Sequence, residues 1–271
     1  MDFFDASAKV RNITADRITA YQAKRLEGGA KPSTANYELA VLRRAFRLGT
    51  RAGKVAGRPE IQMLHVENTR KGFFEPEQYR AVVNHLPEHL GPLAAIAYIT
   101  GWRSKSEWLT RQWRHVDFAN GWLRLDPGES KNGEGRQFPF TPDLRAVLEA
   151  QREKVKAIER ERSCVIPWVL VHEDGRRIKD FRGAWANACK AAGVPGRLVH
   201  DFRRTAVRNL ERAGVPRSAA MKLTGHKTEA VYRRYAITDS AMLQEAAAKL
   251  ATLHAAEGAR QSSVKVAELG V

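Results

Sequence analysis

The sequence predicts a mainly α-helical protein of two domains, the larger of which is α+β because it carries one small antiparallel sheet. Apolar side chains recur at three- and four-residue intervals through most of the 271 residues, as is typical of amphipathic helices. One strong hairpin signal, Asn132-Gly133, lies between two short strand-like runs. The polar and basic stretch 66–73 is expected to be a linker between a small helical domain at 1–65 and a larger domain at 74–256.

Two helices are expected in the small domain, at residues 14–26 and 33–53. Ser33 is a suitable capping residue for the second helix, and Gly53 is suited to end it. The expected inward side chains of the first helix are Ile18, Tyr21 and Leu26. Those of the second helix are Leu39, Leu42, Phe46 and Leu48.

Basic side chains recur on the rest of this second helix. The candidate phosphate contacts, spaced at three- and four-residue intervals, are Arg43, Arg44, Arg47 and Arg51. Thr34 and Asn36, near the start of the helix, are candidates to reach base edges. Taken alone, the pattern fits an ordinary amphipathic surface helix equally well.

Helices also dominate the larger domain. Their expected ranges are 76–86, 90–99, 106–111, 142–160, 180–192, 200–213, 216–224 and 228–235. Residues 122–125 and 136–140 are expected to pair as an antiparallel hairpin with Lys131 at its tip.

A last apolar stripe lies within residues 240–256. Its members are Met242, Leu243, Ala246, Leu250 and Leu253. Because such a stripe is unstable in water, it is expected to pack either on its own domain or on a neighbouring protomer, and the sequence leaves both open. Residues 257–271 are expected to form a flexible tail.

The charge of the chain favours a polyanionic partner. Lys and Arg total 46 against 30 Asp and Glu, a formal net charge of +16, and the pI is about 10.2. Residues 1–72 contain 14 Lys or Arg and 7 Asp or Glu, a net charge of +7 on about a quarter of the chain. The alternative is a merely solvated basic surface.

Cysteine usage and hydropathy narrow the class of protein further. Only Cys164 and Cys189 are present, which excludes a zinc cluster built from cysteines, and no metal or cofactor is expected. No apolar run reaches the roughly 18 residues of a membrane span, and the N-terminus lacks the basic start and apolar stretch of a signal peptide. We therefore expect a cytoplasmic protein that does not bind membranes.

Six polar residues in the larger domain are the candidate catalytic residues. The set, in chain order, is Arg103, Lys131, His200, Arg203, His226 and Tyr235. His200 and Arg203 form a His-x-x-Arg motif, and Tyr235 is the ninth residue after His226. Each motif alone is weak, but their order and spacing together resemble the active site of tyrosine recombinases of the phage integrase family over residues 95–240.

This resemblance implies a fold and a role for each member of the set. The small domain resembles the family's core-binding domain, shortened at its N-terminus, and the larger domain resembles the catalytic domain, the two clamping duplex DNA. Arg103 and Arg203 suit stabilisation of the negative charge that develops on an attacked phosphate, because guanidinium forks bind phosphate oxygens bidentately. His226 is expected to donate a hydrogen bond to the same oxygens.

The remaining residues of the set are expected to take part in the proton transfers of the cleavage step. An ordinary phenol has a pKa of about 10, so the Tyr235 nucleophile needs a base. The resemblance assigns this role to His200, and it assigns to Lys131 the role of the acid that protonates the leaving 5′ oxygen. The product would be a 3′ phosphotyrosine, whose retained bond energy allows rejoining without ATP.

Two further residues, Glu107 and Tyr232, lie near members of this set in the sequence. Family members usually carry an acidic residue three positions after the first arginine, whereas here Ser106 holds that position and Glu107 follows it. The role of Glu107 therefore stays open. Tyr232 is a competing nucleophile, but it is only the sixth residue after His226 and is assigned to packing.

The predicted function is a site-specific DNA recombinase, and the expected type is the integrase of a phage or another mobile element. The residues do not distinguish this type from a chromosome-dimer resolvase or an invertase of the same family. The expected partners are double-stranded DNA and three further copies of the chain, as a homotetramer on paired sites, with an accessory DNA-bending or directionality factor as a further candidate. The alternative is a DNA-binding protein of the same fold that does not cut. A type IB topoisomerase would share the chemistry but act as a monomer on unspecific DNA.

Overall fold

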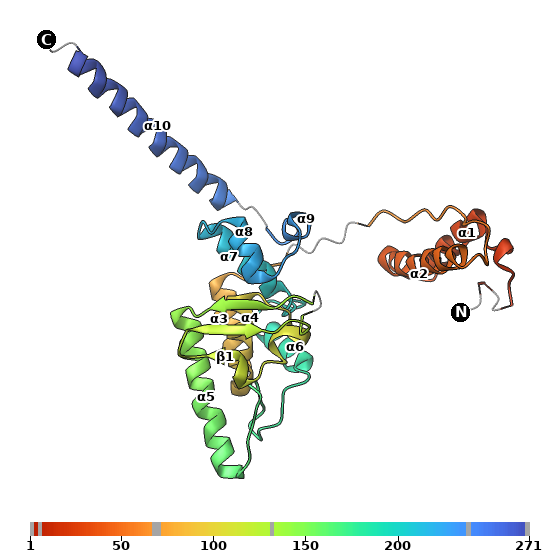
Figure 1. Cartoon of the computed structure of the whole chain (residues 1–271), viewed down its shortest axis with the longest axis horizontal. Helices are drawn as coiled ribbons and strands as arrows, with labels where there is room; N and C mark the ends of the chain where they lie inside the picture. The colour runs from red at the N-terminus through yellow and green to blue at the C-terminus, as the bar shows by residue number, and fades with distance from the viewer. Residues whose placement is uncertain (1–2, 5–6, 67–71, 131–132, 237–239, 269–271) are drawn as a thin grey trace. The chain divides into compact units, whose positions relative to one another are not determined.

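The computed structural model describes residues 3–4, 7–66, 72–130, 133–236 and 240–268 (Figure 1). Two compact units make up the chain, Met1–Arg70 and Lys71–Val271. Their boundary falls inside the predicted linker 66–73, of which residues 67–71 lie outside the described part. The predicted fold class, mainly α with one small antiparallel sheet, is confirmed.

The first unit contains a 3-10 turn (Val10–Asn12) and two helices, α1 (Ala15–Glu27) and α2 (Pro32–Arg51). Thr14 caps α1, since its side chain accepts a hydrogen bond from the backbone N–H of Arg17. The predicted cap at Ser33 was wrong. The helix α2 starts one residue earlier because Pro32, which has no N–H to satisfy, occupies its first position.

The core of the first unit lies between its two helices and the segment that follows them. Its buried members are Ile18, Tyr21, Leu39, Phe46 and Ile61. Two predicted core residues, Leu26 and Leu48, are instead 39% and 49% exposed. Leu48 comes two residues after Phe46, which turns it about 200° around the helix axis and away from the core. Leu26, eight residues after Ile18, is turned about 80° from it.

The second unit is built mainly from helices. Their bounds are α3 (Pro76–Asn84), α4 (Gly91–Thr100), α5 (Pro142–Arg162), α6 (Arg182–Ala191), α7 (Asp201–Arg212), α8 (Arg217–Thr224), α9 (Glu229–Tyr232) and α10 (Ser240–Glu268). Short 3-10 turns lie at Glu88–Leu90 and Trp113–His115, and a π-helix lies at Ser104–Trp108.

Two predicted boundaries at the C-terminal end were wrong. The helix α9 ends at Tyr232, so Tyr235 follows the helix rather than belonging to it. The helix α10 continues through Glu268, beyond the expected boundary at residue 256, and the flexibility of residues 257–271 stays a prediction. On α10, Leu243, Leu250 and Leu253 are 63%, 52% and 54% exposed.

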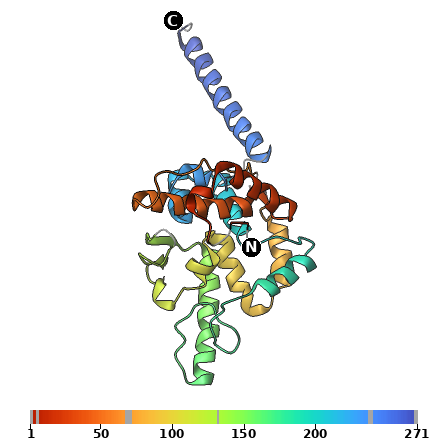
Figure 2. The same ribbon diagram turned by 90° about the vertical axis from the view of Figure 1, so that its right-hand side faces the viewer.

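The sheet has three antiparallel strands in the order β1 (Val116–Asp117), β2 (Trp122–Leu125) and β3 (Arg136–Pro139). The predicted strand pair corresponds to β2 and β3, whose register places Leu125 opposite Arg136. The two-residue strand β1 is too short to leave a pattern in the sequence. Helix α5 begins beside the sheet and extends away from it, across the direction of the strands (Figure 1), and Figure 2 shows the same helix from the side.

Helix α4 is the central element of this unit, and it packs against both α5 and α7. It is apolar on nearly every face, as expected of a helix enclosed by others. Gly101 follows it with a φ of 62°, and a Cβ at this position would lie 2.7 Å from the Cβ of Ala206 on α7. Only glycine fits this approach, which brings the Arg103 segment against α7.

Among the described residues, no helix combines the length and the apolar character that a bilayer crossing requires.

Candidate active site

Tyr235 lies where α7 and the loop after α8 meet. Its Oη is 3.3 Å from Nε2 of His200, and its ring centroid is 4.8 Å from that of His226. The guanidinium carbons of Arg203 and Arg204 lie 5.6 and 5.4 Å from the centre of the phenol ring. The structure therefore brings together the tyrosine, both histidines and one arginine of the predicted set.

Arg203 is held rigidly in the floor of this site. It is 1% exposed, its Nη1 donates to the carbonyl of Gly101 at 2.8 Å, and its Nε donates to Nε2 of His226 at 3.2 Å. Burial and the nearby charge of Arg103 lower the pKa of Arg203 to about 10, so the group stays charged at neutral pH. Within the described residues its buried Nη2 has no hydrogen-bond partner, which leaves a donor for a ligand oxygen.

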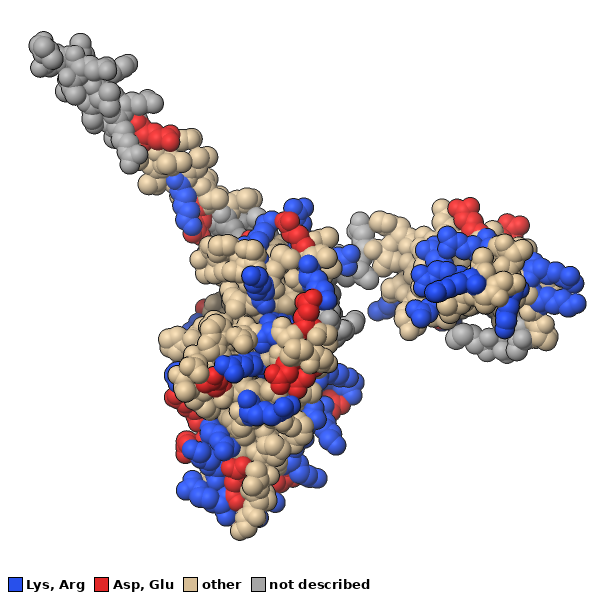
Figure 3. All heavy atoms as spheres, in the orientation of Figure 1, with Lys and Arg blue, Asp and Glu red and all other residues tan. Residues whose placement is uncertain are grey.

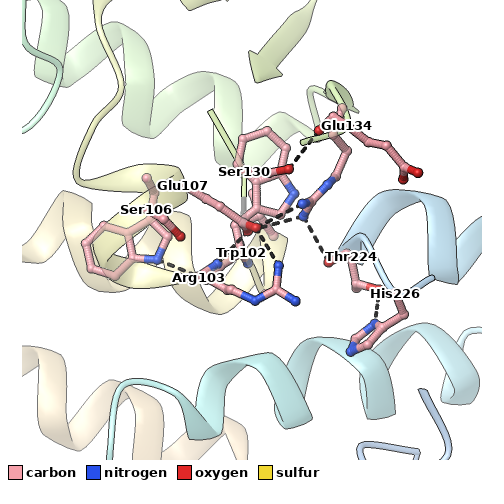
Figure 4. Close-up of polar contacts among 12 residues, drawn as sticks. Trp102, Arg103, Ser106, Glu107, Ser130, Glu134, Thr224 and His226 are labelled. Atoms are coloured by element: carbon pink, nitrogen blue, oxygen red, sulfur yellow. Dashed lines mark hydrogen bonds and ion pairs between the residues drawn. The ribbon is translucent and has the colours of Figure 1, made fainter. Parts of the chain in front are cut away.

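The hydrogen bonds of His226 define its tautomer. The hydroxyl of Thr224 donates to the carbonyl of Ala220 at 2.7 Å, so its oxygen accepts from Nδ1 of His226, also at 2.7 Å (Figure 4). The Nε2 atom then carries no proton and accepts from Arg203. Burial, followed by the charge of Arg203, lowers the pKa of His226 to about 3. In this geometry His226 orients Arg203 and does not offer Nε2–H to a phosphate, contrary to the prediction.

His200 comes directly before the first residue of α7. One side of this residue is exposed to solvent, but the protein atoms packed around its ring, followed by the charge of Arg203, lower its pKa. A neutral imidazole in contact with the phenol can accept a proton from it.

The segment after α4 places Arg103 beside a buried carboxylate. Glu107 is fully buried and accepts hydrogen bonds from the backbone N–H and from Nη1 of Arg103, both at 2.7 Å (Figure 4). Glu107 is the fourth residue after Arg103 rather than the third, and a π-helix accommodates this additional residue. In the π-helix, the N–H of Trp108 bonds to the carbonyl of Arg103, five residues back, at 3.3 Å. Burial opposes ionisation of Glu107, but its bonds to Arg136 and Arg103 outweigh burial and hold its pKa below the usual value.

Arg136 is a residue of this site that the sequence analysis missed. Its Nη2 donates to Glu107 at 2.9 Å, its Nη1 donates to the carbonyl of Thr224 at 2.9 Å, and its guanidinium lies over the ring of Trp102. A Cβ at Gly225 would fall onto this guanidinium. One signal was available, because Arg136 shares a strand face with the apolar residue Phe138, and that face points inward.

Lys131 lies outside the described residues. Two residues that flank it, Ser130 and Glu134, bond to each other within the connection between β2 and β3. The hydroxyl of Ser130 donates to the carbonyl of Glu134 at 2.9 Å, and the Glu134 carboxylate lies 3.0 Å from Nζ of Lys227.

Tyr232, the competing nucleophile, packs inside the unit as predicted. It is fully buried, and its hydroxyl donates to Oε1 of Glu211 at 2.9 Å. Burial and this hydrogen bond raise its pKa well above that of an ordinary phenol. These contacts make its hydroxyl a poor nucleophile.

The candidate DNA contacts on α2 fall into two groups. Thr34, Arg44, Arg47 and Arg51 are exposed, and Lys and Arg side chains gather on the visible face of this unit (Figure 3). Asn36 instead uses its amide for two bonds of 2.8 Å to the backbone of Leu64, and Arg43 donates to the carbonyl of Ile61. In this conformation the Asn36 amide is bonded to Leu64 through its oxygen and one of its two N–H groups, and Arg43 helps to hold the segment after α2.

A second polar cluster contains His115, Asp126 and Glu129. Their ligand atoms lie within 4.8 Å of one another, which is close enough for a metal ion. However, Nδ1 of His115 accepts the N–H of Gln112 at 3.0 Å, so its Nε2 carries the proton and points a donor, not a lone pair, at the carboxylates. A metal ion would need the lone pair of Nε2, which this tautomer does not offer, and among the described residues Nε2 has no hydrogen-bond partner.

Comparisons with known proteins show which family and which folds the chain resembles. The phage integrase family matches residues 73–242. The integrase of Salmonella phage P22 is 25% identical over 221 residues, covering 76% of this chain and 54% of the relative, so the chain spans about half the length of that relative.

Two solved structures share the fold. The Tn1549 transposon integrase in complex with transposon right end DNA has a TM-score of 0.73 at 16% identity and covers 90% of this chain and 87% of its own. A lambda integrase tetramer bound to a Holliday junction has a TM-score of 0.68 at 18% identity and covers 85% of this chain and 66% of its own.

Proposed function

Because the chain belongs to the phage integrase family, we propose that it is a site-specific tyrosine recombinase that cuts and rejoins duplex DNA. One observation carries the proposal. The Tyr235 hydroxyl is 3.3 Å from His200, beside a buried Arg203 that holds an unpartnered donor. A phenol, a base and a free guanidinium donor form the minimum that attack on a phosphodiester requires.

The scissile phosphate binds between the arginines. The free Nη2 of Arg203 and the guanidinium of Arg103 donate to its nonbridging oxygens, where negative charge increases in the transition state. Glu107 fixes Arg103 through two hydrogen bonds, and His226 fixes Arg203 through its Nε2. Because these donors are oriented before DNA arrives, little reorganisation opposes the reaction.

The cleavage step forms one bond and breaks one bond. Oη of Tyr235 attacks phosphorus while its proton passes to Nε2 of His200. The bond from phosphorus to the 5′ oxygen breaks, and this oxygen takes a proton from Lys131, leaving a 3′ phosphotyrosine and a free 5′ hydroxyl. Attack by a 5′ hydroxyl from another strand reverses each transfer and rejoins the DNA.

The remaining assignments follow from this activity. Residues 1–65 serve as a core-binding domain, with the exposed arginines of α2 on phosphates, 66–73 as its linker and 74–256 as the catalytic domain. The active assembly is a homotetramer on paired sites that integrates or excises a mobile element, with accessory DNA-bending or directionality factors where the site requires them. A lambda integrase tetramer on a Holliday junction supports this assembly by analogy of fold. A non-cutting DNA-binding protein is not favoured, because it has no use for the arrangement around Tyr235.

A covalent-adduct assay tests the proposal. Nicked duplexes from DNA that flanks the gene trap the phosphotyrosine, which appears as a shifted band on a denaturing gel. The unaltered protein and Tyr232→Phe should both form the band, whereas Tyr235→Phe should bind the same DNA and form none. An adduct in Tyr235→Phe would refute the nucleophile, and specific binding without any adduct would favour the non-cutting protein.

A further inference from the structure

The geometry points to Arg136 as a positioning residue that fixes the two phosphate-binding arginines, Arg103 and Arg203, relative to each other. It joins the segment that carries Arg103 to the end of α8, which leads through His226 to Arg203. The inference rests on the proposed function, since it assigns Arg136 to the orientation of the cations that bind the scissile phosphate.

The first contact of Arg136 is with the buried carboxylate of Glu107. Oε1 of Glu107 accepts from Nη2 of Arg136 at 2.9 Å and from Nη1 of Arg103 at 2.7 Å. Oε2 accepts from Nη1 of Arg136 at 3.2 Å and from the backbone N–H of Arg103 at 2.7 Å. The side chain of Arg103 is 24% exposed, so packing alone does not fix it. Because both oxygens are shared, the orientation of Arg103 depends on the fork of Arg136.

The second contact of Arg136 is with the end of α8. Its Nη1 donates to the carbonyl of Thr224 at 2.9 Å (Figure 4), and Nε1 of Trp102 donates to the carbonyl of Leu223 at 2.9 Å. Leu223 and Thr224 are the last residues of α8, and carbonyls at this end of a helix have no partner within it. The guanidinium of Arg136 also lies 5.3 Å from the centre of the Trp102 ring. These contacts hold α8 against the segment that carries Arg103.

Thr224 connects Arg136 to the second arginine. Its hydroxyl accepts from Nδ1 of His226 at 2.7 Å, and Nε2 of His226 accepts from Nε of Arg203 at 3.2 Å. The contacts form one chain of residues, in the order Arg103, Glu107, Arg136, Thr224, His226 and Arg203. The two phosphate-binding arginines therefore lie at the ends of a chain that has Arg136 near its centre.

The consequence concerns the placement of two guanidinium groups. Loss of the Arg136 fork would allow Glu107 and Thr224 to move relative to each other, and a misplacement of about 1 Å can slow a reaction by about 100-fold. Arg136→Lys is the informative variant, because it keeps the positive charge but offers a single nitrogen in place of the fork. The defect should concern the negative charge on the nonbridging oxygens, where both arginines act.

A methylphosphonate substrate isolates this role. A methyl group replaces one nonbridging oxygen of the scissile phosphate, so the group is neutral before attack and needs less cationic stabilisation in the transition state. A residue that acts by orienting the two arginines then matters less. A residue that only maintains the fold matters equally for both substrates.

The experiment measures single-turnover cleavage, at saturating protein, of nicked duplexes with phosphate or methylphosphonate at the scissile position. Arg136→Lys should cleave the phosphate substrate about 10- to 100-fold more slowly than the unaltered protein, and the methylphosphonate substrate within about 3-fold of it. Arg208→Lys is the matched control, because the side chain of Arg208 is 2% exposed and pairs with Glu75 at 2.6 Å, outside this chain of residues. Any loss in this control should be equal on both substrates.

Thermal unfolding of each variant identifies a folding defect. If Arg136→Lys is unfolded at the assay temperature, the double variant Glu107→Gln, Arg136→Gln takes its place. Removal of both charges of the pair avoids an unpaired buried charge, and the two amides can bond to each other. The same smaller defect on methylphosphonate is expected of this double variant.

Two results would overturn the inference: equal losses on both substrates, or no loss with phosphate. Arg203→Lys separates the inference from the proposed function, because Arg203 is assigned to the phosphate directly. If methylphosphonate fails to reduce the defect of Arg203→Lys, the assignment of the arginines to the nonbridging oxygens fails, whatever Arg136 does. If it reduces the defect of Arg203→Lys but not that of Arg136→Lys, only the inference on Arg136 fails.

Discussion

Two sets of arginines, one in each unit, differ in how their side chains are held. In the second unit, Arg111, Arg136 and Arg203 are buried or nearly so, and each donates to defined carbonyls, carboxylates or a histidine. In the first unit, Arg44 and Arg47 extend from α2 into solvent.

The buried arginines are suited to orient a substrate, whereas the exposed arginines are suited to raise the affinity for DNA. A buried guanidinium keeps one orientation because its hydrogen bonds offset the loss of hydration, so it can point a donor at one atom of a substrate. An exposed guanidinium keeps many orientations, and it attracts a polyanion mainly by releasing counterions. The second unit is therefore suited to chemistry and the first to binding.

Changing Arg203 should give the largest effect. Arg203→Lys keeps the charge but loses the guanidinium fork, and removal of one preorganised donor typically slows catalysis by about 100- to 1,000-fold. Single-turnover cleavage of a nicked duplex at saturating protein measures this loss, while a gel-shift assay should show nearly unaltered DNA binding. A rate within a few-fold of the unaltered protein would mean that burial of Arg203 serves only the fold.

Glu107→Gln should destabilise the second unit. The substitution removes a buried negative charge that lies between Arg103 and Arg136, and breaking such a pair typically costs about 3 kcal/mol. Urea unfolding measures the loss. The matched control, Glu153→Gln, changes an exposed pair with Lys156 and should leave the unfolding midpoint unaltered. Similar midpoints for both variants would contradict the contrast between buried and exposed pairs.

His226 should make stability depend on pH. Its pKa is lowered to about 3 in the folded chain, against about 6.5 when unfolded, so only the unfolded chain takes up this proton between these values. The contribution of neutral His226 to the free energy of unfolding is complete above pH 6.5. It declines as the pH falls toward 3, by up to about 1.4 kcal/mol per pH unit. His226→Gln should flatten the decline in unfolding free energy from pH 6 to pH 4. An identical slope in both proteins would place the titration elsewhere.

Arg47→Ala should give the smallest effect. If Arg47 contacts a phosphate, its loss weakens DNA binding modestly and lowers the slope of log affinity against log salt by about 0.9. Fluorescence anisotropy at several salt concentrations gives this slope. A slope equal to that of the unaltered protein would remove Arg47 from the DNA interface and weaken the division of labour between the units.

The sequence predicted what depends on local pattern. The limits of α4 follow from an apolar run between Pro92 and Gly101, those of α7 follow from its helical pattern, and the strand pair follows from the Asn132-Gly133 turn. The nucleophile, His200 and Arg203 were predicted because their spacing matches a known family, and the structure brings them together. Their roles stay predictions until tested.

What the sequence did not predict depends on contacts between distant residues. Arg136 belongs to the site only because the register of β3 directs it at Glu107, and because Gly225 leaves room for its guanidinium. The orientation of Glu107 depends on a π-helix that absorbs one residue, which spacing alone did not reveal. Asn36 pairs with Leu64, 28 residues away, so its helix position alone suggested a free amide.

The most direct test of the account is to locate the phosphotyrosine within the trapped adduct. Trypsin cuts after Arg233 and Arg234, so Tyr232 and Tyr235 fall in separate peptides, 228–233 and 235–249. Mass spectrometry of a nuclease-treated adduct should find the added nucleotide on the peptide that contains Tyr235. A nucleotide on the Tyr232 peptide would contradict the account, because that hydroxyl is buried and bonded to Glu211 in the structure.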